Sequence, residues 1–331
     1  MEVILNSPLD MHLHLRQDDV LSAVAPLSAK HFAGAVVMPN LIPPVDSMER
    51  LMQYKADIYS AINGAVFKPY LTAFLKNYTR EEIITFKDEV IAFKLYPAGA
   101  TTNSDGGVED LSHASDTLAM MEEMGIPLCV HGENPKSHVL ERERDFLPTY
   151  AALAEKFPKL KIIMEHITCK EAVELLNNYD NLFATITLQH LLITFDDIAG
   201  GLLNPHLFCK PIAKTFADRD ALRELAFSAH PKVMFGSDSA PHTRDKKECG
   251  LSAAGCFTAP VILPLLTDLF DKHGVLANLQ AFLSDNACKI YGITPPPKKV
   301  VLRKEPWCVP EAYGEFIPAF ANTKVDWSVI E

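Results

Sequence analysis

Short apolar runs that alternate with amphipathic stretches constrain the fold of this chain more than any other feature. Eight such runs recur along 331 residues, which predicts an α/β protein whose parallel sheet closes into a (β/α)8 barrel of the TIM type. An open doubly wound sheet is the alternative, but no GxGxxG motif follows the first run. The expected strands are Met11–Leu15, Ala33–Met38, Val66–Phe74, Val90–Leu95, Pro127–His131, Lys161–His166, Leu182–Thr187 and Lys232–Gly236. The expected helices are Ser47–Ala61, Ser112–Met124, Pro148–Phe157, Cys169–Tyr179 and Ala217–Ala229.

Nothing in the sequence divides the chain into separate domains. Hydrophobic residues make up 48% of it and no Gly/Ser linker interrupts it, so we expect one barrel domain over residues 1–331. Three consecutive prolines at 295–297 end the alternating pattern. We expect residues 296–331 to form an extended C-terminal segment packed on the barrel, although an interface arm is the alternative.

The charge of the chain argues against nucleic acids and membranes as partners. The formal net charge is −11, and no basic run offers a surface for nucleic acid or anionic lipid. No apolar run approaches the ~20 residues that a membrane span needs, and the N-terminus lacks the features of a signal peptide. The seven cysteines include no CxxC pair, which is typical of reduced thiols. We therefore expect a cytoplasmic protein that acts on small molecules.

The first expected strand carries two histidines and an arginine at alternate positions. Because side chains alternate between the faces of a strand, His12, His14 and Arg16 would lie on one face, about 6–7 Å apart at each step. The opposite face would be apolar and would comprise Met11, Leu13 and Leu15. Two imidazoles on one face can share a metal ion, but an isolated HxH pair is also compatible with ordinary polar-face histidines.

Five of the other expected strands carry candidate polar residues in or just after them. Asn40 follows the second strand, where capping the next helix is the simplest role. Lys94 lies inside an apolar strand, where burial of an ammonium is costly; it could extend to solvent or pair with an acid, or lose its proton and be carboxylated by CO2. His131 and His166 end the fifth and sixth strands, and Asp238 follows the eighth.

These positions together predict one metal cluster. Only 12 of the residues are histidine, and the carboxyl ends of all strands meet on one face of a barrel. The predicted cluster comprises His12, His14, Lys94, His131, His166 and Asp238. Two divalent ions would bring four positive charges, and Asp238, a carbamate on Lys94 and a hydroxide would bring three negative charges. The remaining positive charge suits an anionic substrate, and the nitrogen and oxygen ligands suit Zn2+.

The motifs at the strand ends resemble those of the amidohydrolase superfamily, and in particular of the class II bacterial dihydroorotases. The resemblance covers nearly the whole chain. Its motifs are Asp10–Arg16, Met38–Asn40, Phe93–Ala98, Ala100–Asn103, Val130–Glu133, Glu165–Thr168, Gly236–His242 and Ala254–Phe257. One departure is Lys210, at a position where these enzymes have leucine.

The resemblance implies a binuclear zinc site and a substrate pocket beside it. The implied metal ligands, bridged by hydroxide and by carboxylated Lys94, are His12, His14, Lys94, His131, His166 and Asp238. The implied substrate-binding residues are His14, Arg16, Asn40, Thr101, Thr102, His131, Lys210, His242, Ala254 and Gly255. Of these, Arg16, Asn40 and His242 would bind a carboxylate. The main chain at Lys210 and Ala254 would contact the substrate ring. Thr101 and Thr102 would lie on a loop that closes over the substrate.

The activity implied is the reversible cyclisation of N-carbamoyl-L-aspartate to L-dihydroorotate, with Asp238 as general acid and base and a homodimer as the assembly. The nearest alternative is another cyclic amidohydrolase, such as a hydantoinase or allantoinase, with the same metals and a different carboxylate site. A non-catalytic homologue is a second alternative, although it would be expected to lose ligands. A metal-free barrel with incidental histidines is the third.

Overall fold

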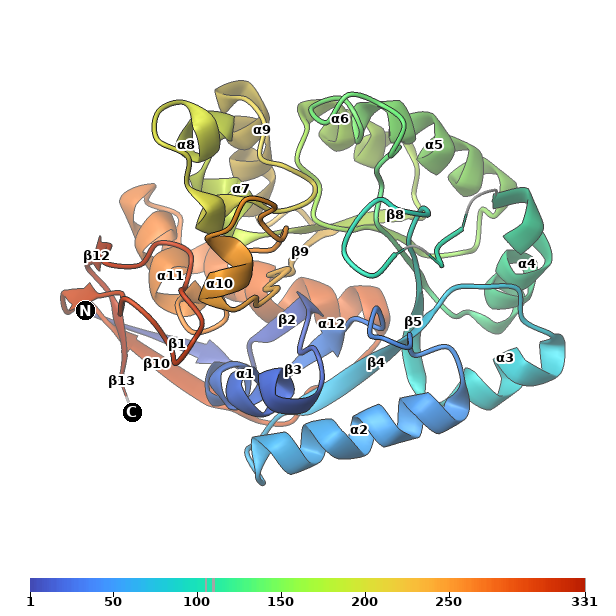
Figure 1. The fold of residues 1–331 in the computed structure, drawn as a ribbon, viewed down its shortest axis with the longest axis horizontal. Coiled ribbons are helices and arrows are strands. Elements are labelled where there is room, and N and C mark those ends of the chain that lie inside the picture. Colours follow the sequence, from blue (N-terminus) through green and yellow to red (C-terminus); the bar gives the residue numbers. More distant parts are fainter. Residues whose placement is uncertain (105, 109–110, 331) are drawn as a thin grey trace.

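The eight-stranded parallel barrel predicted from the sequence is present. The structure is a computed structural model that describes residues 1–104, 106–108 and 111–330. Its strands pair in the order β2 to β9, and helices surround them on the outside (Figure 1). These strands are β2 (Leu9–Leu13), β3 (Gly34–Val37), β4 (Lys68–Phe74), β5 (Val90–Leu95), β6 (Leu128–Val130), β7 (Ile162–Met164), β8 (Leu182–Ile186) and β9 (Val233–Phe235). The ring closes where Asp238 N donates to His12 O (2.8 Å) and His14 N donates to Ser239 O (3.1 Å).

The expected helices are present, with ends that differ by a few residues. The longer helices are α1 (Asp18–His31), α2 (Met48–Ile62), α3 (Arg80–Phe86), α4 (Ser115–Met124), α5 (Leu147–Lys156), α6 (Lys170–Asn178), α9 (Phe216–Phe227) and α11 (Ile262–Lys272). The shorter ones are α7 (Leu188–Leu192), α8 (Phe195–Ala199), α10 (Arg244–Lys247) and α12 (Asn286–Tyr291). Polar caps set several of the starts: the Ser47 side chain accepts from Arg50 N at α2, and Thr215 and Asp218 form a capping box at α9. Within the described residues, no helix is long and apolar enough to cross a membrane.

Among the longer helices, α1, α3 and α11 were not predicted from the sequence. Pro26 lies inside α1, where its missing N–H argues against a helix. In α11, apolar residues such as Ile262, Leu265, Leu266 and Leu269 do recur at helical spacing, so this helix could have been predicted from the sequence.

The apolar side chains form an inner and an outer layer around the barrel strands. Alternate residues, such as Ala92, Ile163 and Met234, belong to the inner cluster, and their neighbours pack against the surrounding helices. The prediction that Met11 shares a face with Leu13 and Leu15 is wrong, because Met11 belongs to the inner cluster and the two leucines to the outer one. The register between β2 and β3 shifts between Asp10 and Leu13, and such a bulge reverses the alternation.

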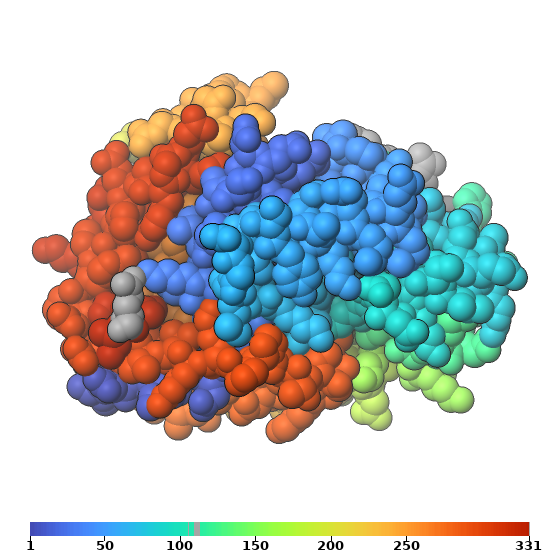
Figure 2. Space-filling model, turned by 90° about the horizontal axis from the view of Figure 1, so that it is seen from below, coloured from blue at the N-terminus to red at the C-terminus, as the bar shows by residue number. Residues whose placement is uncertain are grey.

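A small antiparallel sheet brings the two ends of the chain together. Its order is β1 (Glu2–Asn6), β10 (Lys299–Arg303) and β13 (Ser328–Ile330), and the termini lie on the same side of the molecule (Figure 1). Figure 2 shows the orange and red C-terminal residues beside the blue N-terminal ones. The C-terminal segment also contains an antiparallel pair of short strands, β11 (Trp307–Cys308) and β12 (Lys324–Val325). Its Trp327 side chain is completely buried. The sequence had not indicated β1 as a strand.

Candidate metal centre and active site

The six residues predicted as ligands gather at the carboxyl ends of the barrel strands. His12 lies in β2 and Lys94 in β5, whereas His131, His166 and Asp238 follow β6, β7 and β9 directly or within three residues. Parallel register carries all of these ends to one face of the barrel. All six side chains are buried: His12, His14, Lys94, His131, His166 and Asp238.

His12, His14 and Asp238 form one group that could hold a cation. Their potential ligand atoms all lie within 4.8 Å of one another. The Nε2 atoms of the two histidines are 3.3 Å apart, and Asp238 Oδ1 lies 3.1 Å from His14 Nε2 and 3.5 Å from His12 Nε2. Two imidazole nitrogens and a carboxylate oxygen are a donor set that suits Zn2+.

His131 and His166 form a second group beside the first. His131 Nδ1 lies 3.2 Å from His166 Nε2, and the His12 and His166 ring centroids are 4.9 Å apart. The second nitrogen of His166, Nδ1, is buried without a hydrogen-bond partner in the described structure. The paired nitrogens of this group therefore face a common point next to the first group.

Two glutamates that the sequence had not assigned hold two of the histidines. His12 Nδ1 donates to Glu165 Oε2 (2.7 Å), and His131 Nε2 donates to Glu133 Oε2 (2.8 Å). Thr185 Oγ1 also donates to Glu165 (2.6 Å). A carboxylate that accepts one imidazole N–H leaves the lone pair of the other nitrogen for a metal. The sequence held a signal for Glu133, which lies two residues after His131, but not for Glu165, whose partner His12 is 153 residues away.

The Lys94 ammonium position is fully buried and lacks a hydrogen-bond partner among the described residues. Its Nζ lies 5.1 Å from the centroid of the Tyr96 ring. Burial lowers the pKa of Lys94, although Glu165 opposes the shift. Salt bridging and extension to solvent, the two ordinary explanations of a lysine inside a strand, are therefore both wrong in this structure. A neutral amine at this position is able to react with CO2.

Burial also keeps the neighbouring imidazoles neutral. Desolvation lowers the pKa of His14 and of His166 well below the usual range, and the charges of Arg16 and Lys94 add to the effect at His14. Desolvation lowers the pKa of His12 as well, against the influence of Glu165. Neutral imidazole is the form that binds metals. The donor set, the unpartnered lysine and the neutral rings together fit a binuclear metal site.

Three residues at the site have backbone angles in the left-handed region. They are Arg16 (φ 59°), His166 (φ 42°) and Asp238 (φ 46°), and such angles in residues other than glycine cluster at functional sites. The first barrel strand, β2, spans Leu9–Leu13 and not the predicted Met11–Leu15. Strand alternation therefore does not extend to Arg16. A turn of the backbone directs Arg16 into the same cavity as the histidines.

The predicted carboxylate site lies at the outer edge of this cavity. Arg16 Nη2 is 3.2 Å from His242 Nε2, which lies 3.0 Å from Ala254 O. Burial, followed by the charges of Arg16 and Lys247, lowers the pKa of His242 to about 3. No carboxylate of the described residues pairs with Arg16, so its guanidinium is available for an anionic ligand.

The Thr101–Thr102 loop lies over the site in a closed position. Asn40 Nδ2 donates to Thr102 O (3.0 Å) and Asn103 Nδ2 donates to Asn40 O (3.1 Å). Asn40 thus tethers the loop and does not cap a helix, while its Oδ1 is buried without a partner among the described residues. The enclosed cavity measures about 20 Å³, which is roughly the space of one water molecule. With the loop in this position, the cavity has no room for a molecule much larger than water.

The cavity brings together nearly all of the predicted site residues. Lys94 and His242 are not among its lining residues, but His242 contacts Arg16 and the charge of Lys94 acts on the pKa of His14. The predicted residues that line it are His12, His14, Arg16, Asn40, Thr101, Thr102, His131, His166, Lys210, Asp238, Ala254 and Gly255. Tyr96 and Ala240 line it too and were not predicted. Lys210 precedes a cis peptide bond to Pro211.

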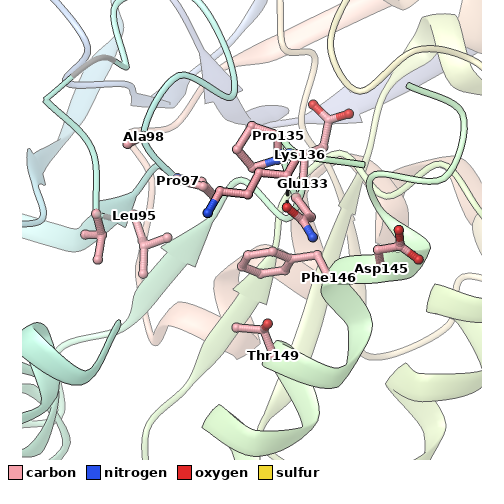
Figure 3. Close-up of a pocket in the computed structure, with 11 residues that line it drawn as sticks. Leu95, Pro97, Ala98, Glu133, Pro135, Lys136, Asp145, Phe146 and Thr149 are labelled. Atoms are coloured by element: carbon pink, nitrogen blue, oxygen red, sulfur yellow. Dashed lines mark hydrogen bonds between the residues drawn. The ribbon is translucent and has the colours of Figure 1, made fainter. Parts of the chain in front are cut away.

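Two larger hollows flank the closed loop. One of about 760 Å³ lies outside it and shares Arg16 and Thr102 with the inner cavity. The other, of about 780 Å³, borders Glu133 and the start of α5. In Figure 3 the Lys136 side chain extends across this second hollow toward Pro97, with Phe146 below it. The first hollow is positioned as an entrance to the site.

Comparison with known proteins agrees with the geometry. The family model described as amidohydrolase matches residues 76–293. Dihydroorotase from Helicobacter acinonychis is 44% identical over 94% of this chain and 92% of its own. The crystal structure of dihydroorotase from Campylobacter jejuni superposes with a TM-score of 0.95 at 50% identity, covering 100% of this chain and 98% of that one. Dihydroorotase from Saccharomyces cerevisiae in complex with 5-fluoroorotic acid superposes with a TM-score of 0.93 at 32% identity, covering 99% and 98%.

The barrel and its strand-end cluster of histidines, aspartate and lysine are those of an amidohydrolase, a class of enzymes that hydrolyse amide bonds with the help of metal. Within that class the chain belongs to the dihydroorotase family, which its relatives name over nearly its full length.

Proposed function

We propose that the chain catalyses the reversible cyclisation of N-carbamoyl-L-aspartate to L-dihydroorotate and water, a step of pyrimidine synthesis. The observation that carries this proposal is the adjacency of two features in one cavity. Five of the six predicted metal ligands line it, and so does Arg16, a cation that has no acidic partner among the described residues. The substrate has a cyclic amide and a carboxylate, which these two features would bind.

We propose two Zn2+ ions at the centre. His12, His14 and Asp238 would hold one ion, His131 and His166 the other, and carboxylated Lys94 would bridge them. Carboxylation joins the neutral Lys94 amine to CO2 and releases one proton, and the absence of a partner at Lys94 Nζ supports it. When bound, the metals would polarise the amide carbonyl and lower the pKa of water to about 7.

Asp238 is proposed to move the proton. In hydrolysis it would accept a proton from the attacking water and donate it to the ring nitrogen as the amide bond breaks. In the synthetic direction it would take the proton from the carbamoyl nitrogen. Burial raises the pKa of the Asp238 carboxyl, opposed by His12 and His131, which moves it toward the neutral range where a general base is most effective.

The remaining residues would bind and enclose the substrate. Arg16, with Asn40 and His242, would take its carboxylate, and the main chain at Ala254 and Lys210 would meet the ring. Closure of the Thr101–Thr102 loop would exclude bulk water, which strengthens the polar interactions inside. We further propose a cytoplasmic homodimer, which light scattering of the purified protein would test.

Assays of the purified protein test the proposed reaction. Turnover of dihydroorotate and of carbamoyl aspartate should be measured beside hydantoin and allantoin, together with the metal content. We expect turnover of the first two substrates only, with about two metal ions per chain. Turnover of hydantoin or allantoin in their place would assign the chain to another cyclic amidohydrolase, and full metal loading without any turnover would indicate a non-catalytic homologue.

A further inference from the structure

A buried lysine outside the metal cluster joins the two loops that line the substrate side of the cavity. Lys247, the last residue of α10, is 3% exposed. Its ammonium donates to three main-chain oxygens: Ala253 O (2.7 Å), Gly255 O (2.9 Å) and Phe208 O (3.1 Å). An ammonium has three N–H donors, so these acceptors use all of them. In the described part of the chain, no carboxylate pairs with this charge.

The three acceptors fix the backbone on both sides of Ala254. A peptide unit is planar and trans, so its N–H points away from its C=O. Because Lys247 holds the carbonyl of Ala253, the N–H of Ala254 points away from Lys247, and Ala254 lines the cavity. Among the described residues this N–H has no hydrogen-bond acceptor. Lys247 therefore sets the direction of a free donor, the Ala254 N–H, by holding the Ala253 carbonyl at the opposite edge of the same peptide unit.

The other two contacts of Lys247 make the segment rigid. Gly255 N donates to the same Phe208 oxygen that Lys247 holds (2.9 Å), and Phe208 is two residues before Lys210. Gly255 has a φ of 147°, and a Cβ there would lie 2.6 Å from Ala240 O, so only glycine fits. The lysine thus ties the segment before Lys210 to the segment around Ala254.

We propose that Lys247 is a positioning residue for substrate binding, which holds the Ala254 main chain against the substrate ring and adds positive charge at the carboxylate end of the cavity. This inference rests on the proposed function. The chain as a whole carries a net charge of −11, so an anionic substrate depends on local cations, and Arg16 and Lys247 both lack an acidic partner among the described residues. Lys247 does not meet the metal cluster, so its contribution falls on binding and not on the chemical step.

Substitution of Lys247 in the metal-loaded enzyme tests the proposal. Lys247→Met keeps the length of the side chain and removes its charge and donors, and Lys247→Gln restores donors without charge. Lys246→Met is the matched control, since Lys246 is the exposed neighbour on the same helix. The measurements are kcat and KM for dihydroorotate, calorimetric binding of 5-fluoroorotate, metal content and Tm.

We expect Lys247→Met to raise KM and the Kd for 5-fluoroorotate by about tenfold or more, the equivalent of one hydrogen bond to a charged group. Its kcat should stay within about threefold and its metal content unchanged, with Lys247→Gln in between and Lys246→Met like wild type. Unchanged KM and Kd in Lys247→Met would overturn the role of Lys247 while the proposed function stands. Misfolding of both Lys247 variants, or loss of kcat and metal together, would also overturn it in favour of a purely structural role. Wild-type protein that neither turns over dihydroorotate nor binds 5-fluoroorotate would overturn the proposed function and this inference with it.

Discussion

The metal side and the substrate side of the cavity are built in different ways. On the metal side, side chains from the ends of barrel strands meet, and buried carboxylates hold them, as Glu165 holds His12 and Glu133 holds His131. On the substrate side, loops meet, and polar side chains hold their main-chain groups, as Lys247 holds the Ala253 and Gly255 carbonyls. The loop over the site is likewise held by one of its main-chain groups, since the Asn40 side chain donates to Thr102 O.

This difference separates chemistry from recognition. Strand ends are fixed by the register of the sheet, so the metal ligands keep their positions when the loops move. The substrate side includes the Thr101–Thr102 loop, which would have to open for the proposed ring substrate to enter a cavity of about 20 Å³. Substitutions on the metal side should therefore affect kcat or metal content, and substitutions on the substrate side should affect KM.

The largest effect is expected from Asp238→Asn on the metal side. The amide cannot accept the proton from water, so kcat should fall by about 10³-fold or more, in keeping with a loss of acid–base catalysis. Four histidines and Lys94 remain, so metal content measured by atomic absorption should stay largely intact. Asp245→Asn, an exposed acid in the same segment, is the control. A kcat near that of wild type would disprove the role of Asp238 as the base.

Lys94→Ala should lose activity, and small carboxylic acids should rescue part of it. Without the bridging carbamate, the activation barrier should rise by about 4 kcal/mol, so that kcat falls on the order of a thousandfold. Metal content should also decrease. Acetate or propionate should restore part of the activity, because a small carboxylate can enter the space that the side chain leaves. The comparison is activity with and without added acid, beside the same titration of wild type. Full activity of the variant without acid would exclude a bridge at this position.

The residues on the metal side could be predicted from the sequence because they belong to a regularly repeated element, the end of a barrel strand. The carboxyl ends of the parallel strands meet on one face of the barrel, so residues that closely follow them, such as His131, His166 and Asp238, gather there. It failed where local geometry departs from alternation: the bulge in β2 moves Met11 inward, and Arg16 reaches the cavity through a left-handed turn. It also left Glu165 and Lys247 without a role, because a partner 153 residues distant along the chain or a main-chain acceptor has no local pattern.

Arg16→Ala should produce the largest effect on the substrate side. Loss of a charge-assisted hydrogen bond costs about 1.5–3 kcal/mol, which corresponds to a rise of about 10- to 100-fold in KM for dihydroorotate. Metal content should not change, because Arg16 contacts His242 and Pro241 O and not the metal ligands. The measurement is a pair of KM and metal determinations. If Arg16→Ala instead lost metal with KM unchanged, the division between the two sides would be wrong.

Glu165→Gln should weaken the metal side without abolishing it. Loss of the carboxylate that holds a ligating histidine typically costs 10- to 100-fold in metal affinity, and the Glu165 carboxyl is ionised at neutral pH, since the influence of His12 and Lys94 outweighs burial and lowers its pKa to about 2. Competition with a chelator would measure the affinity, with Glu133→Gln as the parallel variant for His131. Equal metal retention in Glu165→Gln and wild type would show that the hydrogen bond to His12 does not direct its lone pair.

The smallest effect is expected from Lys210→Leu, at the position where the sequence departs from the resemblance. If the substrate meets only the main chain at Lys210, the side chain is dispensable, and kcat and KM should stay within about threefold, as for surface substitutions that remove no buried partner. The side chain is partly exposed, so its removal leaves no buried polar group unpaired. Steady-state kinetics at low and moderate salt would detect any contribution of its charge, which salt should screen. A salt-dependent rise in KM would show instead that this side chain contributes to binding the anionic substrate, and that recognition on this side does not depend on the main chain alone.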